Sequence, residues 1–341
     1  MDVLGLPLLA VATILMTLGF EFVNGFHDSA NSIATIVATR VLTPVKAVAW
    51  AATFNFLGIF ISDNVAKTIG KGIIDQDMLW DYGVSLIFCA VVGAILWDLI
   101  TWWWGIPTSS SHALIGGLIG AGCAVWGLDA IVWSGTLKTI AFIIISPMAG
   151  LIAGFILMVL VMHLVRHLAR GTVNKWFRKL QLVSSGFFSL THGTNDAQKG
   201  MGIIMMVLFL SEGASPESEF TVYTWVVLAC GLSIALGTFF GGWRIVKTMA
   251  SRITKLDPYQ GFCAETGGAG VLLFTAILGI PVSTTHTISG SIMGVGATKR
   301  LSAVRWGLGR KIVIAWAVTI LASATISGLL FLAFVHLGWT G

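Results

Sequence analysis

A motif of proline, hydroxyl residues and histidine occurs twice in the sequence. Residues 105–112 read Gly-Ile-Pro-Thr-Ser-Ser-Ser-His, and residues 279–286 read Gly-Ile-Pro-Val-Ser-Thr-Thr-His. With two later glycines included, seven of sixteen positions are identical at an offset of 174 residues. This density of identity predicts an internal duplication, in which each copy occupies an equivalent place in its half of the fold.

Each copy places hydroxyl groups where a new helix is expected to begin. Proline is tolerated in a first helical turn because its missing N–H has no partner there. The free amides and hydroxyls at a helix start attract anions, so two facing starts would bind a tetrahedral oxyanion without a fixed charge. Simple helix capping by these hydroxyls is the alternative. The predicted oxyanion ligands are Thr108, Ser109, Ser110, Ser111, His112, Ser283, Thr284, Thr285 and His286.

The two histidines of these motifs allow two interpretations. A histidine inside a helix commonly hydrogen-bonds a backbone carbonyl, which would make His112 and His286 structural. The alternative is a direct role as an oxyanion donor or a proton acceptor, because the imidazole changes charge near neutral pH.

A second pair of motifs carries carboxylates. Gly25-x-x-Asp28 matches Gly193-x-x-Asp196 at an offset of 168 residues. A carboxylate inside an apolar segment is costly and is a functional candidate by default, with a structural salt bridge as the alternative. We expect the helix to break at residues 24–32 and again at 192–200, which would free backbone carbonyls for a hard cation. The predicted ligands of this coupling cation are Asp28, Asn31, Asn195 and Asp196.

Two further ionic residues belong with this predicted cation site. Lys199 stands at the position equivalent to Asn31, where its ammonium would occupy or repel a cation site, or act as a counter-ion for Asp196 or the substrate. Glu265 lies in an apolar segment sixteen residues before Pro281, and we predict a role in coupling for it too. Glycines repeated four residues apart after each histidine predict close helix packing rather than chemistry.

The elements that position these motifs are predicted to be membrane-spanning helices. Only 10% of the 341 residues are charged, 56% are hydrophobic and the mean hydropathy is +0.90. Repeated apolar runs of about 20 residues indicate an integral helical membrane protein. The first run, residues 4–23, lacks a basic leading region and is expected to be a retained helix rather than a signal peptide. The four cysteines have no metal or redox spacing, so we interpret them as small buried hydrophobes.

The distribution of basic residues predicts the topology. Sixteen of the 20 Lys and Arg residues fall in four short segments, which we interpret as cytoplasmic loops. The loops between them, residues 63–81 and 212–219, are acidic or mixed and are expected outside. The net charge of +5 therefore needs no nucleic-acid partner. The basic residues of the four segments are Arg40 and Lys46; Arg166, Arg170, Lys175, Arg178 and Lys179; Arg244, Lys247, Arg252 and Lys255; and Lys299, Arg300, Arg305, Arg310 and Lys311.

These observations predict an all-α integral membrane protein built as an inverted-topology repeat, with broken helices and two helical hairpins. The first repeat is residues 1–165, the second is residues 182–341, and a basic cytoplasmic linker, residues 166–181, joins them. The first half starts outside and the second starts inside, so both termini are expected outside the plasma (inner) membrane. This architecture is typical of secondary transporters, whose site lies at the repeat interface near the middle of the membrane.

The signature motifs resemble those of the PiT family of inorganic phosphate transporters. The resemblance rests on residues 25–32, 192–196 and 281–286, and it extends over essentially the whole chain. It implies symport of phosphate with protons or sodium, phosphate ligands on the hairpin hydroxyls, cation ligands at the aspartates and nearby amides, and a homodimer in the lipid bilayer. It implies no resident cofactor or metal and no enzymatic activity.

Two positions depart from the usual family pattern. His27 stands where an asparagine precedes the first aspartate, and Lys199 replaces a second-half asparagine. Both departures resemble the bacterial low-affinity Pit branch, which implies proton coupling and phosphate carried with a divalent metal. We therefore include His27 among the coupling residues and expect protons rather than sodium. Some family members carry sulfate, so a sulfate or related oxyanion symporter stays an alternative.

Two other classes of protein were weighed against a coupled transporter. An intramembrane hydrolase could use serine, histidine and aspartate, but an enzyme needs one nucleophile rather than a symmetric pair. A passive phosphate channel would need no buried acids, and their presence in both halves favours coupled transport.

Overall fold

The computed structural model describes residues 2–3, 6–74, 79, 82–212, 221–252 and 255–338. Helices make up nearly all of this described chain. Those of the first half are α1 (Leu8–Ala38), α2 (Pro44–Gly58), α3 (Asn64–Gly72), α4 (Gly83–Trp104), α5 (Ser110–Trp126) and α6 (Trp133–Val165). Those of the second half are α7 (Arg170–Glu212), α8 (Thr224–Phe240), α9 (Trp243–Arg252), α10 (Pro258–Ile277), α11 (Thr284–Ala297) and α12 (Trp306–His336). The smaller elements are the paired strands β1 (Asp2–Val3) and β2 (Leu6–Pro7) and the 3-10 turns η2 (Gly127–Ala130) and η3 (Leu301–Ala303).

Several helices are long and apolar enough to cross a membrane. Within the described residues these are α1, α4, α5, α6 and α12, and the pair α8–α9 meets the same criterion with a bend of 68° between its two parts. The 43 residues of α7 run beside α1, but its basic first turns and polar middle lower its hydropathy. The all-α membrane fold predicted from composition is therefore confirmed.

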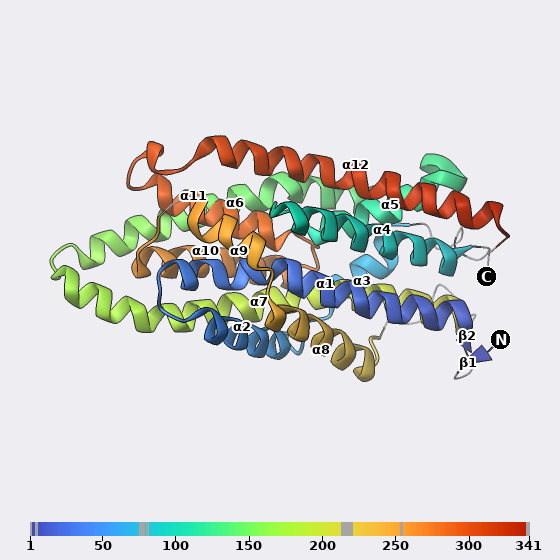
Figure 1. The fold of residues 1–341 in the computed structure, drawn as a ribbon, viewed down its shortest axis with the longest axis horizontal. Helices are drawn as coiled ribbons and strands as arrows, with labels where there is room; N and C mark the ends of the chain where they lie inside the picture. Colours follow the sequence, from blue (N-terminus) through green and yellow to red (C-terminus); the bar gives the residue numbers. More distant parts are fainter. Residues whose placement is uncertain are drawn as a thin grey trace.

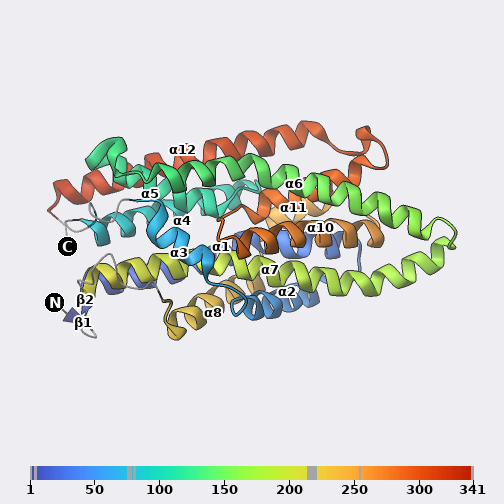
Figure 2. The same ribbon diagram turned by 180° about the vertical axis from the view of Figure 1, so that it is seen from behind.

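The helices run along the long axis of the molecule in two opposite directions. The elbow between α6 and α7 lies at one end, and both termini lie at the other (Figure 1). Helices α1 and α6 run toward the elbow, whereas α7 and α12 run away from it. The hairpin α4–α5 enters from the end with the termini, the hairpin α10–α11 enters from the elbow end, and their turns meet near the middle. The reverse view in Figure 2 shows the same arrangement.

The packing of the helices is reciprocal between the two halves. Helix α5 packs on α12, and α11 packs on α6; likewise α1 packs on α8, and α7 packs on α2. Exchanging the halves turns each contact into its counterpart. The two predicted hairpins are present, and the reciprocal packing agrees with the predicted duplication.

Two apolar cores lie on either side of a polar middle layer. One core contains Phe20 and Ile203 and reaches toward the termini, and the other contains Ile33 and Ile288 and reaches toward the elbow. Between Phe20 and Ile33, helix α1 buries mostly polar side chains. Burial of apolar surface on both sides therefore fixes the depth at which these polar groups sit.

The breaks predicted in the two signature segments are not present. Helix α1 is continuous through residues 24–32, and α7 is continuous through residues 192–200. The glycines there serve close packing instead. A Cβ on Gly25 would collide with the backbone of Ile234 in α8, and a Cβ on Gly193 would collide with the backbone of Asn55 in α2. Bent elements do occur, but in the next part of the repeat, where α8 turns into α9.

Three segments predicted as loops contain helices. Most of the predicted basic linker, residues 166–181, belongs to α7, which begins at Arg170. The segment predicted as an external loop, residues 63–81, contains α3, which buries Val65 and Ile69 against α7. The third basic segment forms much of α9. Helices as short as α3 and α9 have too few residues for a hydropathy window to separate them from loops, and the first turns of α7 are too rich in basic residues to be recognised as part of an apolar segment.

Candidate functional site

The two hairpin turns are built in the same way. Gly105 ends α4 with φ of 66°, and Gly279 ends the turn after α10 with φ of 65°. This left-handed conformation is one that glycine adopts without strain. A proline lies two residues after each glycine, and Ser109 and Ser283 then cap α5 and α11 by accepting hydrogen bonds from the third backbone N–H beyond them. The repeated sequence thus directs two helix starts into the interior of the protein.

The two turns touch each other in the middle of the molecule. The hydroxyl of Ser111 donates to the carbonyl oxygen of Val282 over 3.1 Å. The predicted serine and threonine ligands at both turns are at most 2% exposed. The facing helix starts expected from the sequence are therefore brought together, with their hydroxyls in one buried layer.

The middle of α1 meets the turn of the opposite half. Asn31 donates its side-chain amide to Thr285 over 2.9 Å and to Thr284 over 3.3 Å. The Asp28 carboxylate accepts from the Thr285 hydroxyl at 3.4 Å and from the Ser110 hydroxyl at 3.1 Å. Asp28 therefore lies between hydroxyls that come from both hairpins.

His27 connects Asp28 to the first hairpin. Its Nδ1 lies 2.6 Å from the Asp28 carboxylate. Its Nε2 lies 3.3 Å from the hydroxyls of both Thr101 and Thr108. Thr108 thus belongs to the polar layer through His27, in addition to its place in the turn.

The middle of α7 supplies a second carboxylate with a lysine beside it. Lys199 Nζ lies 3.0 Å from Asp196 Oδ1, and Thr284 donates to Asp196 Oδ2 over 3.3 Å. His192 Nε2 also lies 3.4 Å from Asp196 Oδ2. The ammonium has no hydrogen-bond acceptor with good geometry among the described residues, so its N–H groups can turn toward an anion.

Three of these groups approach closely enough to share a metal ion. Ligand atoms of Asp28, His192 and Asp196 all lie within 4.8 Å of one another. Carboxylate oxygen and imidazole nitrogen suit a divalent metal. The cluster thus has the ligand types and spacing for a divalent metal, with the positive charge of Lys199 beside it.

His192 and Asn24 were not predicted as site residues, yet both lie in the polar layer. Asn24 accepts from Ser110 over 2.5 Å. The offset of 168 residues would have found them, because it pairs Asn24 with His192 and His27 with Asn195. The two halves thus carry the same two side-chain types in exchanged positions.

Three predicted site residues, the two hairpin histidines and Glu265, lie apart from this layer or face away from it, whereas Asn195 keeps a buried side-chain oxygen without a partner among the described residues. His112 and His286 pack on each other with ring centroids 4.5 Å apart, and His286 stacks on Trp316 at 3.6 Å. Within α5, Ser110 and Ser111 precede His112 by two and one positions, so the imidazole is rotated around the helix axis from them by about 200° and 100°. Asn195 donates to the carbonyl oxygens of Thr191 and Leu272, which is a structural contact for its amide nitrogen.

Glu265 forms a separate buried network nearer the elbow. It accepts from Thr35 over 2.6 Å and from Gln181 over 3.0 Å, and Ser184 also donates to it. The prediction of a buried functional carboxylate at this position stays a prediction, and the structure places it away from Asp28 and Asp196.

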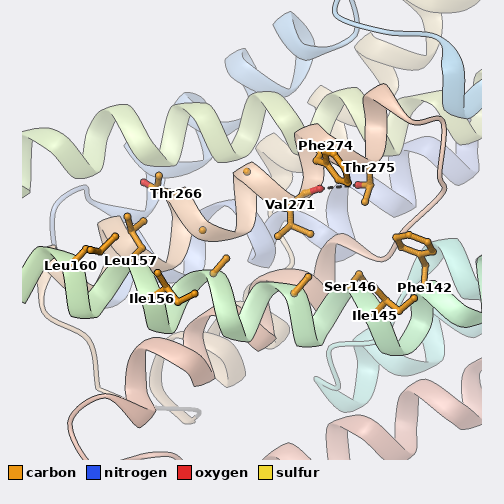
Figure 3. A pocket seen from close by; sticks show the side chains of 14 residues that line it. Phe142, Ile145, Ser146, Ile156, Leu157, Leu160, Thr266, Val271, Phe274 and Thr275 are labelled. Carbon is orange, nitrogen blue, oxygen red and sulfur yellow. Dashed lines mark hydrogen bonds between the residues drawn. The ribbon is translucent and has the colours of Figure 1, made fainter.

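A groove between α6 and α10 differs in character from the polar layer. It has a volume of about 570 Å³ and is lined almost entirely by apolar side chains such as Ile145, Ile156 and Phe274 (Figure 3). None of the predicted site residues lines it. The polar and ionic side chains that could bind an anion or a cation lie instead in the buried layer between the hairpin turns.

This combination defines a class of protein. Two hairpin turns with hydroxyl-rich helix starts meet two membrane helices that carry buried ionic groups, which is the arrangement of a membrane transport protein with its site near the midplane. The sequence model of the phosphate transporter family matches residues 24–327. The chain therefore belongs to the phosphate transporter family.

Related proteins agree with this assignment over nearly their full lengths. A probable low-affinity inorganic phosphate transporter of Rhizobium meliloti (strain 1021) is 55% identical over 331 residues, which cover 97% of each chain. A probable low-affinity inorganic phosphate transporter of Bacillus subtilis (strain 168) is 42% identical and covers 97% of this chain and 98% of its own. A solved structure titled the sodium-dependent phosphate transporter superposes with a TM-score of 0.87 at 25% identity, covering 96% of this chain and 99% of its own.

These findings confirm the family resemblance and the expectation of a phosphate transporter rather than an enzyme. The protein is a multi-pass membrane protein of this family.

Proposed function

We propose that the protein imports inorganic phosphate across the plasma membrane by symport with protons. Phosphate would bind in the layer between the two hairpin turns, where the hydroxyls of Ser110, Ser111, Thr284 and Thr285 and the helix starts of α5 and α11 offer hydrogen-bond donors. Neutral donors bind an oxyanion and still allow its release, which a carrier requires.

The coupling role is assigned to the carboxylates of Asp28 and Asp196. Both are buried, and each touches a hydroxyl from a hairpin turn, so a change in its charge would alter the site that binds phosphate. His27 would exchange a proton with Asp28 over their 2.6 Å contact.

The observation that carries the choice of proton over sodium is the ion pair of Lys199 with Asp196, whose charged atoms are 3.0 Å apart. At an effective dielectric of ~20, two unit charges about 4 Å apart interact by roughly 4 kcal/mol. A sodium ion beside Asp196 would meet this repulsion, whereas a proton adds no ion to coordinate. Sodium is the second candidate, because the superposed structure is titled a sodium-dependent transporter.

Phosphate carried as a neutral metal complex would meet less of this repulsion than a free sodium ion, because the charge of the phosphate offsets that of the metal. Asp28, His192 and Asp196 could bind the metal, and the Lys199 ammonium could bind a phosphate oxygen. The metal would then be cargo rather than a resident group.

Transport would open the phosphate site alternately to the two sides of the membrane by a movement of the two halves of the duplicated fold. We infer that residues 1–165 and 182–341 move against each other about the site, with both termini outside and the α6–α7 elbow in the cytoplasm, since the elbow carries one of the two basic segments with five Lys and Arg residues. The homodimer implied by the family resemblance stays a prediction.

The anion is tested by uptake of labelled phosphate into proteoliposomes with an imposed inward proton gradient. We expect accumulation above the equilibrium level, which a protonophore collapses and a several-fold excess of sulfate leaves largely unchanged. Equal inhibition by unlabelled sulfate and phosphate would reject phosphate selectivity, and uptake that never exceeds equilibration would favour a channel.

A further inference from the structure

A cavity of about 910 Å³ lies at the elbow end of the molecule, apart from the hairpin turns. It is enclosed by the end of α1, by the elbow between α6 and α7, and by the start of α10. Three arginines line it, Arg166, Arg170 and Arg178, together with the side chain of Thr39. None of the residues predicted to bind phosphate or the coupling cation belongs to its lining.

The cavity carries an excess of positive charge. Its one acidic lining residue, Asp257, is engaged elsewhere: it caps the first turn of α10 and lies 3.4 Å from Lys299. Within the described part of the chain, no carboxylate lies at ion-pair distance from Arg166, Arg170 or Arg178. Guanidinium groups without a carboxylate bind phosphate oxygens well, because their planar donors match two oxygens at once.

All three arginines are exposed to solvent, and two features favour a bound anion between them. Arg178 is held in place, since its guanidinium donates to the carbonyl oxygen of Arg40 over 2.8 Å. Arg170 is the first residue of α7, so the unpaired N–H groups of a 43-residue helix begin at the same wall.

A chain of buried hydrogen bonds leads from this cavity toward the proposed phosphate site. Thr39 in the cavity wall donates to Gln181 over 2.9 Å, and Gln181 donates to Glu265 over 3.0 Å. Thr35 donates to the same carboxylate from one turn further along α1, and Asn31 lies one more turn inward. Polar side chains thus follow one face of α1 from the cavity to the hairpin turns.

The other end of the molecule has no equivalent chain at these positions. The repeat offsets pair Thr35 with Ile203, and Glu265 with Val91, and both counterparts are buried and apolar. The polar chain is therefore specific to the elbow side, and the duplication alone does not account for it.

We infer that the arginine-lined cavity is an inner vestibule, a second site at which inorganic phosphate binds between the transport site and the cytoplasm. The hydrogen bonds from Thr39 through Gln181 to Glu265 form the closed barrier between the two sites. This inference rests on the proposed function for the identity of the anion.

Thiol protection tests the vestibule directly. Asn174 lines the cavity and is exposed, so Asn174→Cys introduces a reporter, while the parent chain with its four native cysteines gives the background. The protein is held in nanodiscs of phosphatidylcholine and labelled with a negatively charged or a positively charged methanethiosulfonate. The anionic reagent should react several-fold faster, and millimolar inorganic phosphate should slow that reaction several-fold.

Two matched double variants distinguish an effect of the cavity arginines from an effect of positive surface charge in general. Arg166→Gln with Arg170→Gln should remove both the charge preference and the protection by phosphate. Arg300→Gln with Arg305→Gln, which changes the same charge on a different loop, should leave both unchanged. A phosphate effect that survives loss of Arg166 and Arg170, or no phosphate effect at all, overturns the inference.

Two further measurements complete the test. One identifies whether a lipid headgroup or inorganic phosphate protects the thiol, and the other tests the proposed transport function separately. If phosphatidylglycerol in the nanodisc protects the thiol and inorganic phosphate does not, the cavity binds a lipid headgroup and the vestibule is rejected. Labelled phosphate uptake is measured on the same preparations. Absence of uptake by the parent chain refutes the proposed function, whereas normal uptake without thiol protection refutes only the vestibule.

Discussion

The side-chain amide of Asn31 lies 2.9 Å from the hydroxyl oxygen of Thr285, although 254 residues separate the two in sequence. Asn31 belongs to α1 of the first half, and Thr285 begins α11 in the hairpin of the second half. The contact therefore joins a helix that carries a coupling carboxylate to a turn that is proposed to hold phosphate.

Removing the Thr285 hydroxyl should weaken phosphate binding without unfolding the hairpin. Thr285→Val keeps the shape of the side chain and deletes its contacts with Asn31 and Asp28. A lost hydrogen bond of about 0.5–1.5 kcal/mol corresponds to a rise in KM of roughly twofold to tenfold. Thr287→Val is the matched control, because among the described residues that hydroxyl bonds only to the carbonyl of Ser283 within its own helix turn. Equal KM values for the two variants would contradict a substrate-binding role.

Neutralising either central carboxylate should abolish driven uptake. Asp28→Asn and Asp196→Asn keep the size of the side chain but prevent the change of charge that coupling requires. Both proteins should still insert, since neither substitution adds charge to the membrane. The comparison is Asp63→Asn, an exposed residue paired with Lys67. Parental accumulation by Asp28→Asn or Asp196→Asn would exclude that carboxylate from the mechanism.

The glycine of the first signature should matter for packing rather than for backbone flexibility. A Cβ at Gly25 would collide with the α8 backbone, whereas nothing lies within 4 Å of a Cβ at Gly19 in the same helix. Gly25→Ala should lower the free energy of unfolding by about 1–3 kcal/mol. Gly19→Ala should be neutral or slightly stabilising in the same thermal denaturation. Equal melting temperatures would argue against close α1–α8 packing.

The orientation of the elbow can be checked with single cysteines. We expect Thr172→Cys, near the start of α7, to react with a membrane-impermeant maleimide only after the cells are opened. Leu128→Cys lies in η2 at the opposite end (Figure 1) and is exposed, so it should react in intact cells. Labelling of the first variant alone in intact cells would invert the proposed topology.

The duplicated motifs predicted the two hairpin turns better than they predicted the helices that pack against them. The identities at Pro107 and Pro281 predicted two hairpin turns, and the structure brings those turns together. The glycines at 25 and 193 were interpreted as helix breaks because glycine has two common uses in membrane helices, and only the neighbouring helix decides between them.

The direction of individual side chains is the second feature that the sequence did not predict. His112 and His286 directly follow the hydroxyl residues in the sequence, which is why they are included among the predicted oxyanion ligands. In a helix, however, each successive residue is rotated by about 100°. The rotation directs the two imidazoles toward each other and Trp316 instead of toward Asp28 and Asp196. His192 was not predicted for a different reason: its counterpart in the first half is Asn24, so the two positions do not show an identity between the repeats.

The measurement that tests proton coupling most directly is uptake of labelled phosphate into proteoliposomes at fixed, equal pH with only a sodium gradient and a clamped membrane potential. The Lys199–Asp196 pair predicts little accumulation by the parent protein under these conditions, and strong accumulation when an inward proton gradient replaces the sodium gradient. Lys199→Asn should reduce the proton-driven uptake and allow sodium to drive it. Strong sodium-driven accumulation by the parent protein, insensitive to a protonophore, would contradict the account.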